Sequence, residues 1–432
     1  MTALSTIFWG IVILGLIVFI HEGGHYLTAR AFKVRVTEFM LGLPGPSIGF
    51  KPKRSETRFG VTVVPLGGYA RIAGMDETCD ETNLPTTVEI LYAQGRIGYE
   101  TADMLSENLG YDFGASLETL YDWGCAKRVK KSRGVFEYVA PECDGFDLAE
   151  PRELADPVGF IAAERKKTYI SLPWWKRMII LFGGAGANLL FAIIVITGIL
   201  MFAGTSNPSL TISDASQGMP AYEAGIRAGD TLLAVDGVSV DEWMEFSEIV
   251  SSHKVGDVVE IAYERNGERF TATIELAESA DGRPVIGVIS GTEIVKHGLF
   301  DALGTSFSYI GLVTEAILKL INPMTTAEII SESSSIIGIS VAAREAASAG
   351  WISFIYLTAA ISISIGLMNL LPLMPLDGGR MIVETVQRIT RKKASTRVLN
   401  WYSMIGIALV LVLFVFAMKQ DITSLITGVW PW

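Results

Sequence analysis

The chain has 432 residues, of which 50% are hydrophobic and only 19% are charged, and its mean hydropathy is +0.39. This composition is too apolar for an ordinary soluble enzyme of this size, so we expect a membrane protein. The net charge of −11 argues against a nucleic-acid partner, because phosphate binding needs basic clusters. Peptides and the lipid bilayer are the expected partners.

The first predicted element, residues 1–33, is a transmembrane helix. Residues 1–20 contain no Lys or Arg, which differs from the basic start of a cleavable signal peptide. Arg30, Lys33 and Arg35 follow the apolar run directly. Because basic residues mark the cytoplasmic end of a span, the N-terminus is expected outside the cell.

The end of this span carries the sequence HEGGH, from His21 to His25. Four residues apart on a helix, the two histidines share one face and can bind one Zn²⁺ ion. Glu22 lies about 100° round the helix from His21, where it can take a proton from an attacking water. Taken alone, the HExxH pattern is about as consistent with an accidental match on a surface helix as with a metal site. Beside an apolar run, where each unpaired His or Glu costs roughly 2–3 kcal/mol, a functional site is favoured.

Two glycines, Gly23 and Gly24, lie between the histidines. Each lowers helix stability by about 1 kcal/mol relative to Ala. We therefore expect another backbone to come close at this point, and a substrate chain is one candidate.

Residues 34–75 are predicted to form a membrane-associated β-hairpin region. The alternating sequence FGVTVV and the turn sequence PLGG indicate short strands. A plain surface sheet accounts for this pattern about as well as a functional hairpin does. The functional interpretation is a hairpin at the mouth of the site that offers an unpaired edge to an unwound substrate.

Residues 76–163 are polar, mixed in charge and contain all three cysteines, Cys79, Cys125 and Cys143. We expect a small inserted cytoplasmic α/β segment. The cysteine spacing matches neither a zinc knuckle nor a disulfide set, so reduced thiols are expected. The basic sequence 127–133 is interpreted as solvated or facing lipid headgroups, and the sequence assigns the insert no role.

Residues 164–206 are predicted to form an interfacial segment and the second transmembrane helix. Basic residues and the pair Trp174 and Trp175 are typical of the cytoplasmic interface before a span. Glycines at the start of the span allow close helix packing, and the polar Asn188 needs a partner in the bundle. We interpret Asn188 as a helix-packing residue slightly in preference to a site residue.

Residues 207–292 are predicted to form an extracytoplasmic β-rich domain with one helix around Trp243–Ser252. Acidic residues far outnumber basic ones across 204–350, which favours an outside location. Residues 293–350 are expected to be amphipathic or linker helices. Within them, 299–322 is predicted to lie at the outer surface or against the bundle rather than to span it.

Residues 351–380 are predicted to be the third transmembrane helix, which ends in NLLPLMPLDGG. Pro372 and Pro375 break the helix at membrane depth, which is tolerated where the chain lines a cavity or is buried. Asp377 follows the break. Because spans one and three both end on the cytoplasmic side, it comes to the depth of His25 and completes a His₂-carboxylate zinc set with an open fourth position.

Asn369 lies inside the third span, where it could donate to a substrate backbone or to the oxyanion. Residues 381–432 are predicted to be a basic cytoplasmic segment, the fourth transmembrane helix from Asn400 to Ala417 and a short outer tail. Both termini are therefore expected outside. The expected fold is a four-span α-helical membrane protein with a β-hairpin region, an inserted α/β segment and a β-rich outer domain.

Together these residues resemble the site-2 protease family of intramembrane metalloproteases, in its RseP type with a PDZ domain between the second and third spans. The similar sequences are HEGGH, PLGGYARIAG, the GxxxN of the second span, PAxxAGxxxGD and NLLPLMPLDGG. They follow the family's order and cover most of the chain, but not the insert.

The resemblance implies that His21, His25 and Asp377 bind Zn²⁺ and that Glu22 is the catalytic base. It implies that 207–292 is a PDZ domain. This domain would restrict access to substrates already trimmed outside the membrane.

The resemblance also implies a substrate-binding set. Asn369 would help to bind the substrate, and the 59–75 hairpin would pair with an extended substrate through Gly67, Gly68 and Tyr69.

The expected function is an intramembrane zinc endopeptidase of the bacterial inner membrane, with its active site near the cytoplasmic side. Its substrates would be single-span proteins, such as anti-sigma factors or signal-peptide remnants. A non-catalytic membrane scaffold is one alternative, but a closed structural zinc site does not need the carboxylate of Glu22. A metal transporter is another, and the small number of spans without a repeat of the motif argues against it.

Overall fold

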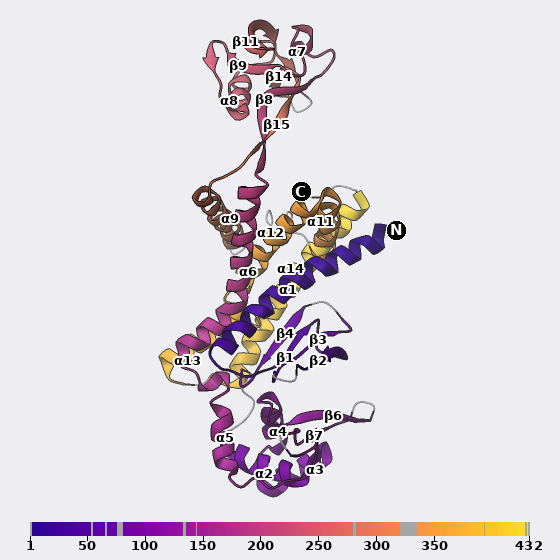
Figure 1. The fold of residues 1–432 in the computed structure, drawn as a ribbon, viewed down its shortest axis with the longest axis vertical. Helices are drawn as coiled ribbons and strands as arrows, with labels where there is room; N and C mark the ends of the chain where they lie inside the picture. Colours follow the sequence, from indigo (N-terminus) through magenta and orange to yellow (C-terminus); the bar gives the residue numbers. More distant parts are fainter. Residues whose placement is uncertain are drawn as a thin grey trace. The chain divides into compact units, whose positions relative to one another are not determined.

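The computed structural model divides into two compact units, Met1–Ile196 with Ser306–Trp432, and Thr197–Thr305 (Figure 1). It describes every residue except 1, 53–54, 65–66, 76–80, 133–134, 144, 280–281, 320–334, 393, 428–429 and 431–432.

In the described part of the chain, four helices are long and apolar enough to cross a membrane. They are α1 (Thr2–Ala31), α6 (Trp174–Phe202), α12 (Trp351–Asn369) and α14 (Thr396–Thr427). The four apolar helices expected from the sequence are therefore present.

The last of these helices is longer than predicted, because α14 continues past Ala417. Its Asp421 is fully buried and belongs to the fold rather than to an outer tail. The Asp421 Oδ2 accepts hydrogen bonds from the backbone amides of Ser335, at 2.9 Å, and Gly338, at 2.7 Å. These amides start α11 (Ile336–Ala349), so the carboxylate satisfies helix donors that lack intrahelical partners.

We expect Asp421→Ala to lower the melting temperature of the purified protein in detergent. The change leaves buried amides at the start of α11 without an acceptor, which costs about 1–3 kcal/mol. Asp421→Asn keeps one acceptor oxygen and should lose less stability. An unchanged melting temperature in the alanine variant would show that this cap contributes nothing to the fold.

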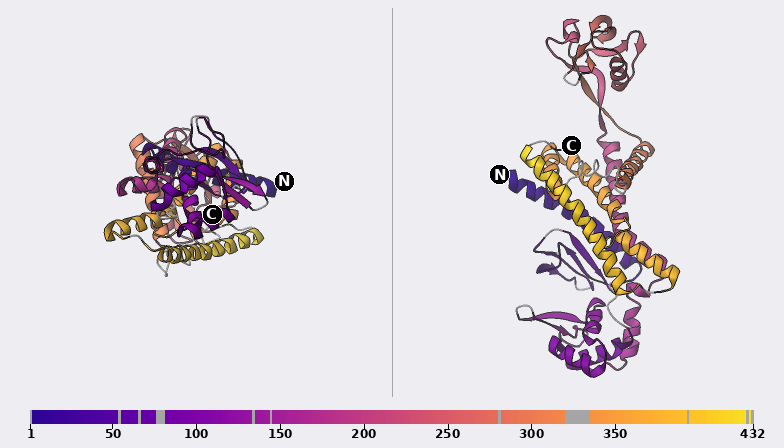
Figure 2. Two further views of the ribbon diagram at one scale, coloured as in Figure 1. Left: turned by 90° about the horizontal axis from the view of Figure 1, so that it is seen from below. Right: turned by 180° about the vertical axis from the view of Figure 1, so that it is seen from behind.

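The chain turns back at a break between α12 and α13 (Asp377–Thr390), as the two prolines predict (Figure 2). A Cβ atom on Gly378 would lie 2.2 Å from the Leu370 oxygen, so this position needs glycine. Gly406 of α14 is equally tight, since a Cβ there would lie 1.7 Å from the Met374 oxygen. These close approaches fix the start of α13. The basic segment predicted after residue 380 is largely this helix.

A four-stranded sheet takes the place of the predicted hairpin region, and its strand order is β2-β3-β1-β4. The strands are β1 (Val36–Leu41), β2 (Ser47–Phe50), β3 (Arg58–Thr62) and β4 (Gly68–Ile72). The predicted 59–75 hairpin is wrong, because β3 and β4 lie on opposite sides of β1, β3 parallel to it and β4 antiparallel. β4 is consequently an edge strand.

The insert is a small α/β domain with a three-stranded sheet, in the order β5-β7-β6. Its elements are α2 (Leu84–Gln94), β5 (Arg96–Gly98), α3 (Tyr99–Leu109), α4 (Phe113–Asp122), β6 (Lys127–Ser132), β7 (Val135–Val139) and α5 (Pro157–Arg165), preceded by a 3₁₀ turn, Glu81–Asn83. Trp123 and Phe113 anchor a core of its own.

Cys125 and Cys143 are free thiols, as expected, whereas Cys79 lies outside the described residues. Burial raises the pKa of the Cys125 thiol to about 12, so this cysteine is a packing residue rather than a nucleophile.

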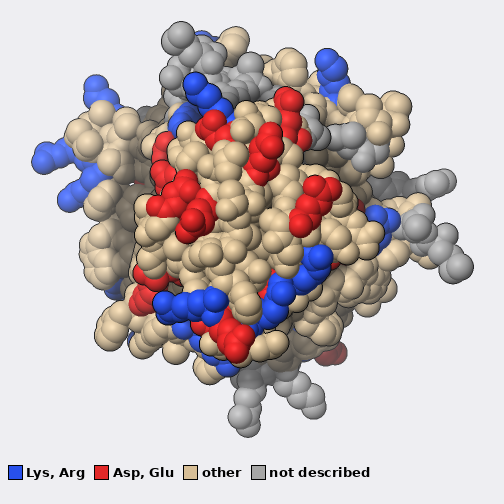
Figure 3. All heavy atoms as spheres, turned by 90° about the horizontal axis from the view of Figure 1, so that it is seen from above, with Lys and Arg blue, Asp and Glu red and all other residues tan. Residues whose placement is uncertain are grey.

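The second unit is a β-rich domain with the strand order β12-β11-β9-β8-β15. Its strands are β8 (Thr205–Ala215), β9 (Thr231–Val235), β10 (Val238–Ser239), β11 (Val258–Arg265), β12 (Glu268–Glu275), β13 (Ala277–Glu278), β14 (Pro284–Val285) and β15 (Val288–Val295). Its helices are α7 (Pro220–Glu223) and α8 (Trp243–Ser252), the latter at the predicted position. Acidic side chains are spread over the face seen in Figure 3. The helix α9 (Leu299–Lys319) follows.

Candidate metal centre

The two histidines of α1 point their Nε2 atoms toward one another, 3.3 Å apart. The Nδ1–H of His25 donates to the Ile180 carbonyl of α6 at 2.8 Å. Because this bond occupies the Nδ1 side of the ring, the Nε2 atom carries the free lone pair. The contact with α6 therefore leaves the Nε2 atom of His25 available to a metal ion.

Asp377, the first residue of α13, brings a carboxylate to both rings. Its Oδ2 atom lies 3.2 Å from the Nε2 of His21 and 3.2 Å from the Nε2 of His25. Among the described residues, these three form the only group of His, Cys, Asp or Glu side chains that could hold a metal ion. Residues 352 positions apart in the chain thus meet at one point.

The spacing of the three donor atoms fits Zn²⁺. A tetrahedral zinc ion with bonds of about 2.0–2.1 Å holds its ligands about 3.3 Å apart. The three separations here are 3.3, 3.2 and 3.2 Å. Two imidazoles and one carboxylate are a catalytic type of ligand set, because the fourth position stays open.

Glycines on α6 make room for this arrangement. A Cβ atom on Gly184 would lie 2.3 Å from the Nε2 of His25 and 2.8 Å from that of His21. A Cβ on Gly24 would lie 2.0 Å from the Gly183 oxygen, so α6 supplies the close backbone that this glycine was expected to meet. Gly23 has open space around its Cβ direction.

Asn188 of α6 contacts the other side of His21. It is fully buried, and its Nδ2 lies 3.4 Å from the His21 Nδ1, while its Oδ1 has no hydrogen-bond partner among the described residues. The two ends of an amide have nearly the same size. A flip of the amide group places Oδ1 beside His21, where it accepts a hydrogen bond from the Nδ1–H group. The Nε2 atom of His21 is then free to bind a metal ion. The sequence interpretation of Asn188 as a packing residue missed this contact.

We expect Asn188→Ala to weaken zinc binding by about 10- to 100-fold, because the His21 ring loses the partner that orients it. Asn188→Asp keeps an acceptor oxygen and should bind zinc more tightly than the alanine variant. Competition with a chromophoric chelator measures both affinities. If the alanine variant binds zinc as the unchanged protein does, Asn188 serves packing alone.

Glu22 lies between the metal ligands and the edge strand β4. Its carboxylate interacts electrostatically with His25, His21 and Asp377, and it accepts a hydrogen bond from the Ala70 backbone amide. The arrangement therefore places a carboxylate beside the ligand set without making it a ligand.

The open edge of β4 runs past Glu22. The Gly67 carbonyl accepts a hydrogen bond from the Gly42 amide, so this peptide group faces the sheet. Because successive peptide groups of a strand point in opposite directions, those of Gly68 and Ala70 face the open edge, in agreement with the bond from Ala70 to Glu22. Among the described residues no strand pairs with this edge, so the edge beside the candidate metal site is open apart from the bond between Ala70 and Glu22.

The side chains of Tyr69 and Asn369, which were predicted to bind substrate, both make hydrogen bonds within the protein. The Tyr69 hydroxyl donates to Glu38 at 3.1 Å, and burial together with this carboxylate raises the pKa of Tyr69 to about 12. Tyr69 thus stays neutral and holds β4 against β1. The Asn369 amide donates to the Ile365 carbonyl of its own helix at 3.0 Å.

Comparison with known proteins identifies relatives of the whole chain. The sequence profile of Peptidase family M50 matches residues 9–413. The chain is 28% identical to the zinc metalloprotease RasP of Shouchella clausii, over 98% of this chain and 100% of that protein. It is 24% identical to the regulator of sigma-W protease RasP of Bacillus subtilis, over 98% and 99%. A PDZ domain structure from Listeria monocytogenes is 28% identical over 20% of this chain and 90% of that chain, with a TM-score of 0.18.

Proposed function

Because the chain belongs to Peptidase family M50, we propose that it is an intramembrane zinc endopeptidase whose active site is the centre formed by His21, His25 and Asp377. The convergence of these three donor atoms at tetrahedral spacing is the observation that carries the proposal. A bound zinc ion supplies Lewis-acid chemistry, which acidifies water and polarises the carbonyl of a peptide bond.

The residues of the chain supply the proton transfers and the positioning. Glu22 takes the proton of the attacking water and delivers it to the leaving amine. The Asn188 side chain keeps the His21 ring oriented, and the Ile180 carbonyl does the same for His25. His21, His25 and Asp377 would hold the metal ion, and the scissile carbonyl would enter beside Glu22.

The substrate binds as an extended strand along β4. A transmembrane helix hides its carbonyls behind side chains and internal hydrogen bonds, so it must unwind before cleavage. Pairing with the amide and carbonyl of Gly68 and with the carbonyl of Ala70 replaces part of the lost hydrogen bonding and sets the substrate beside Glu22. Asn369 completes this set by turning its amide from the Ile365 carbonyl to the substrate backbone.

Strand pairing predicts an alternating cross-linking pattern. In protein carrying Glu22→Gln and Tyr69→Cys, single cysteines placed along the substrate should form disulfides at every second position, because side chains alternate along a strand. A helical substrate would give maxima every three to four positions and would exclude pairing with β4. Removal of Cys79, Cys125 and Cys143 keeps the labelling specific.

We further propose that four helices span the inner membrane with both termini outside and the metal centre near the cytoplasmic side. The support is the placement of Arg30, Lys33 and Arg388 after the first and third spans. Residues 207–292, within the unit Thr197–Thr305, are then an extracytoplasmic PDZ domain that admits trimmed single-span substrates. Since one relative is named a regulator of sigma-W protease, membrane anti-sigma factors are the proposed substrates, with signal-peptide remnants as a second group.

The function is tested with purified protein and a tagged single-span substrate in detergent. Cleavage should stop when a chelator removes the metal and should return when about one equivalent of Zn²⁺ is added. Cleavage that survives complete removal of metal would contradict the proposal.

A further inference from the structure

A cavity of about 370 Å³ with a strongly basic lining lies where α5, the start of α6 and the end of α13 come together. Five cationic side chains line it, against a single carboxylate. These residues are Arg165, Arg177, Arg388, Arg391 and Lys392, with Glu81 as the carboxylate. None of them contributes to the metal centre.

The ion pairs of this cavity leave part of its charge uncompensated. Arg165 pairs with Glu81 at 2.5 Å, and Arg177 pairs with Glu384 at 2.7 Å. Within the described ranges, no carboxylate lies within ion-pair distance of Arg388, Arg391 or Lys392. Three like charges around one cavity repel one another, so a bound anion would stabilise this region.

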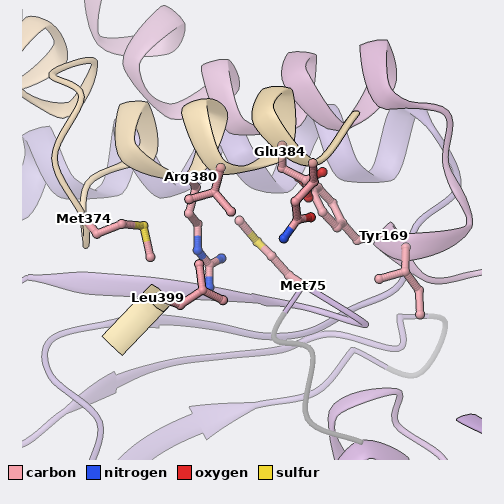
Figure 4. A pocket seen from close by; sticks show the side chains of 9 residues that line it. Met75, Tyr169, Met374, Arg380, Glu384 and Leu399 are labelled. Atoms are coloured by element: carbon pink, nitrogen blue, oxygen red, sulfur yellow. The ribbon is translucent and has the colours of Figure 1, made fainter. Parts of the chain in front are cut away.

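An adjoining cavity of about 230 Å³ has a mixed lining, in which Arg380, Glu384 and Gln387 accompany mostly apolar and aromatic side chains. It shares Ile170 and Gln387 with the basic cavity, so the two lie side by side. Figure 4 shows the side chains of Met75, Met374 and Leu399 around it. The two neighbouring cavities therefore offer a strongly basic part and a more apolar part, which matches an amphiphile better than a small soluble anion.

The outer face of α13 has the character of a helix at a membrane surface. Ile382, Val386 and Ile389 are exposed and form one stripe, since they are spaced by four and three residues. The helix follows the apolar helix α12 after the break that contains the two prolines. A stripe of this kind beside basic residues is typical of helices that lie at the boundary between headgroups and acyl chains.

We propose that this composite cavity binds an anionic phospholipid, with its phosphate on Arg388, Arg391 and Lys392 and part of an acyl chain beside Met75 and Met374. Arginine forks match phosphate oxygens, and basic pockets at the cytoplasmic ends of transmembrane helices recognise anionic headgroups. The inference rests on the proposed membrane location but not on proteolysis. Because α13 begins at the metal-site residue Asp377, the bound lipid also holds that carboxylate in place.

The test uses delipidated full-length Glu22→Gln protein in neutral detergent, titrated calorimetrically with short-chain phosphatidylglycerol, short-chain phosphatidylcholine or inorganic phosphate. Phosphatidylglycerol should bind saturably, and the other two should bind at least about tenfold more weakly. The double variant Arg388→Gln/Arg391→Gln should lose about thirty-fold in affinity, given the usual contribution of a basic residue at an anionic lipid surface.

Lys130→Gln/Lys131→Gln is the matched control, since it removes two exposed charges from β6 and should leave the affinity unchanged. Arg388→Lys/Arg391→Lys should retain most of the binding, which separates loss of charge from loss of folding. Equal affinity of both glutamine double variants would overturn the proposal, as would equal binding of the two lipids. Binding of inorganic phosphate as tight as that of phosphatidylglycerol would assign the cavity to a soluble anion instead.

Discussion

Protein carrying Glu22→Gln should keep about one zinc ion per chain and lose proteolysis by about 10²- to 10⁴-fold, the usual contribution of a general acid–base group. Glutamine has the shape of glutamate but cannot accept the proton of the attacking water. The ligand atoms of His21, His25 and Asp377 are untouched by the change. The measurement is the rate of cleavage of a tagged single-span substrate, with bound zinc quantified in the same preparations.

Glu107→Gln on the exposed face of α3 is the control and should cleave as the unchanged protein does. The result also separates the alternatives. A scaffold would bind zinc and cleave nothing in either form, and a transporter would show no link between Glu22 and proteolysis. Full cleavage by Glu22→Gln would remove the carboxylate from the mechanism.

Gly184→Ala should lower zinc affinity by at least about 100-fold and abolish cleavage at limiting zinc. The added methyl group would lie 2.3 Å from one ligand nitrogen and 2.8 Å from the other, so the two rings must separate. Loss of a single orienting partner already costs about 10- to 100-fold, and here the ligand atoms themselves are displaced. Chelator competition measures the affinity.

Gly198→Ala, on the same helix, is the matched control because nothing lies within 4 Å of its Cβ position. Alanine favours a helix over glycine by about 1 kcal/mol, so neither change should unfold α6. If both variants bind zinc equally, the close packing of α6 on the histidines is not required for the metal site.

The three candidate ligands could be predicted from the sequence because each lies in a stretch with its own local pattern, although Asp377 is 352 residues away from His25. His21 and His25 lie on one helix turn, and the prolines before Asp377 mark a break where a carboxylate can face a cavity. The charge pattern then brings Asp377 to the same depth. The structure brings these three side chains within hydrogen-bond distance of one another.

The parts that could not be predicted depend on contacts between distant segments. The parallel pairing of β1 with β3 joins strands that are not neighbours in the chain, so no local sequence pattern indicates it. Residues 59–75 were therefore predicted to form a hairpin, whereas in the structure β4 pairs with β1. The fourth span was predicted to end at Ala417, but the helix continues and its Asp421 is a buried cap for α11. A lone buried amide such as Asn188 has many possible partners, and only the packed helices select His21.

The most direct measurement locates the cut in a single-span substrate reconstituted with the protein in lipid vesicles. Mass spectrometry of both products gives the scissile bond. The proposed water-activating centre on α1, beside the open edge of β4, predicts a cut inside the apolar segment, toward its cytoplasmic end, that depends on Zn²⁺ and Glu22. A cut confined to the soluble part of the substrate, or one that persists without Glu22, would contradict the account.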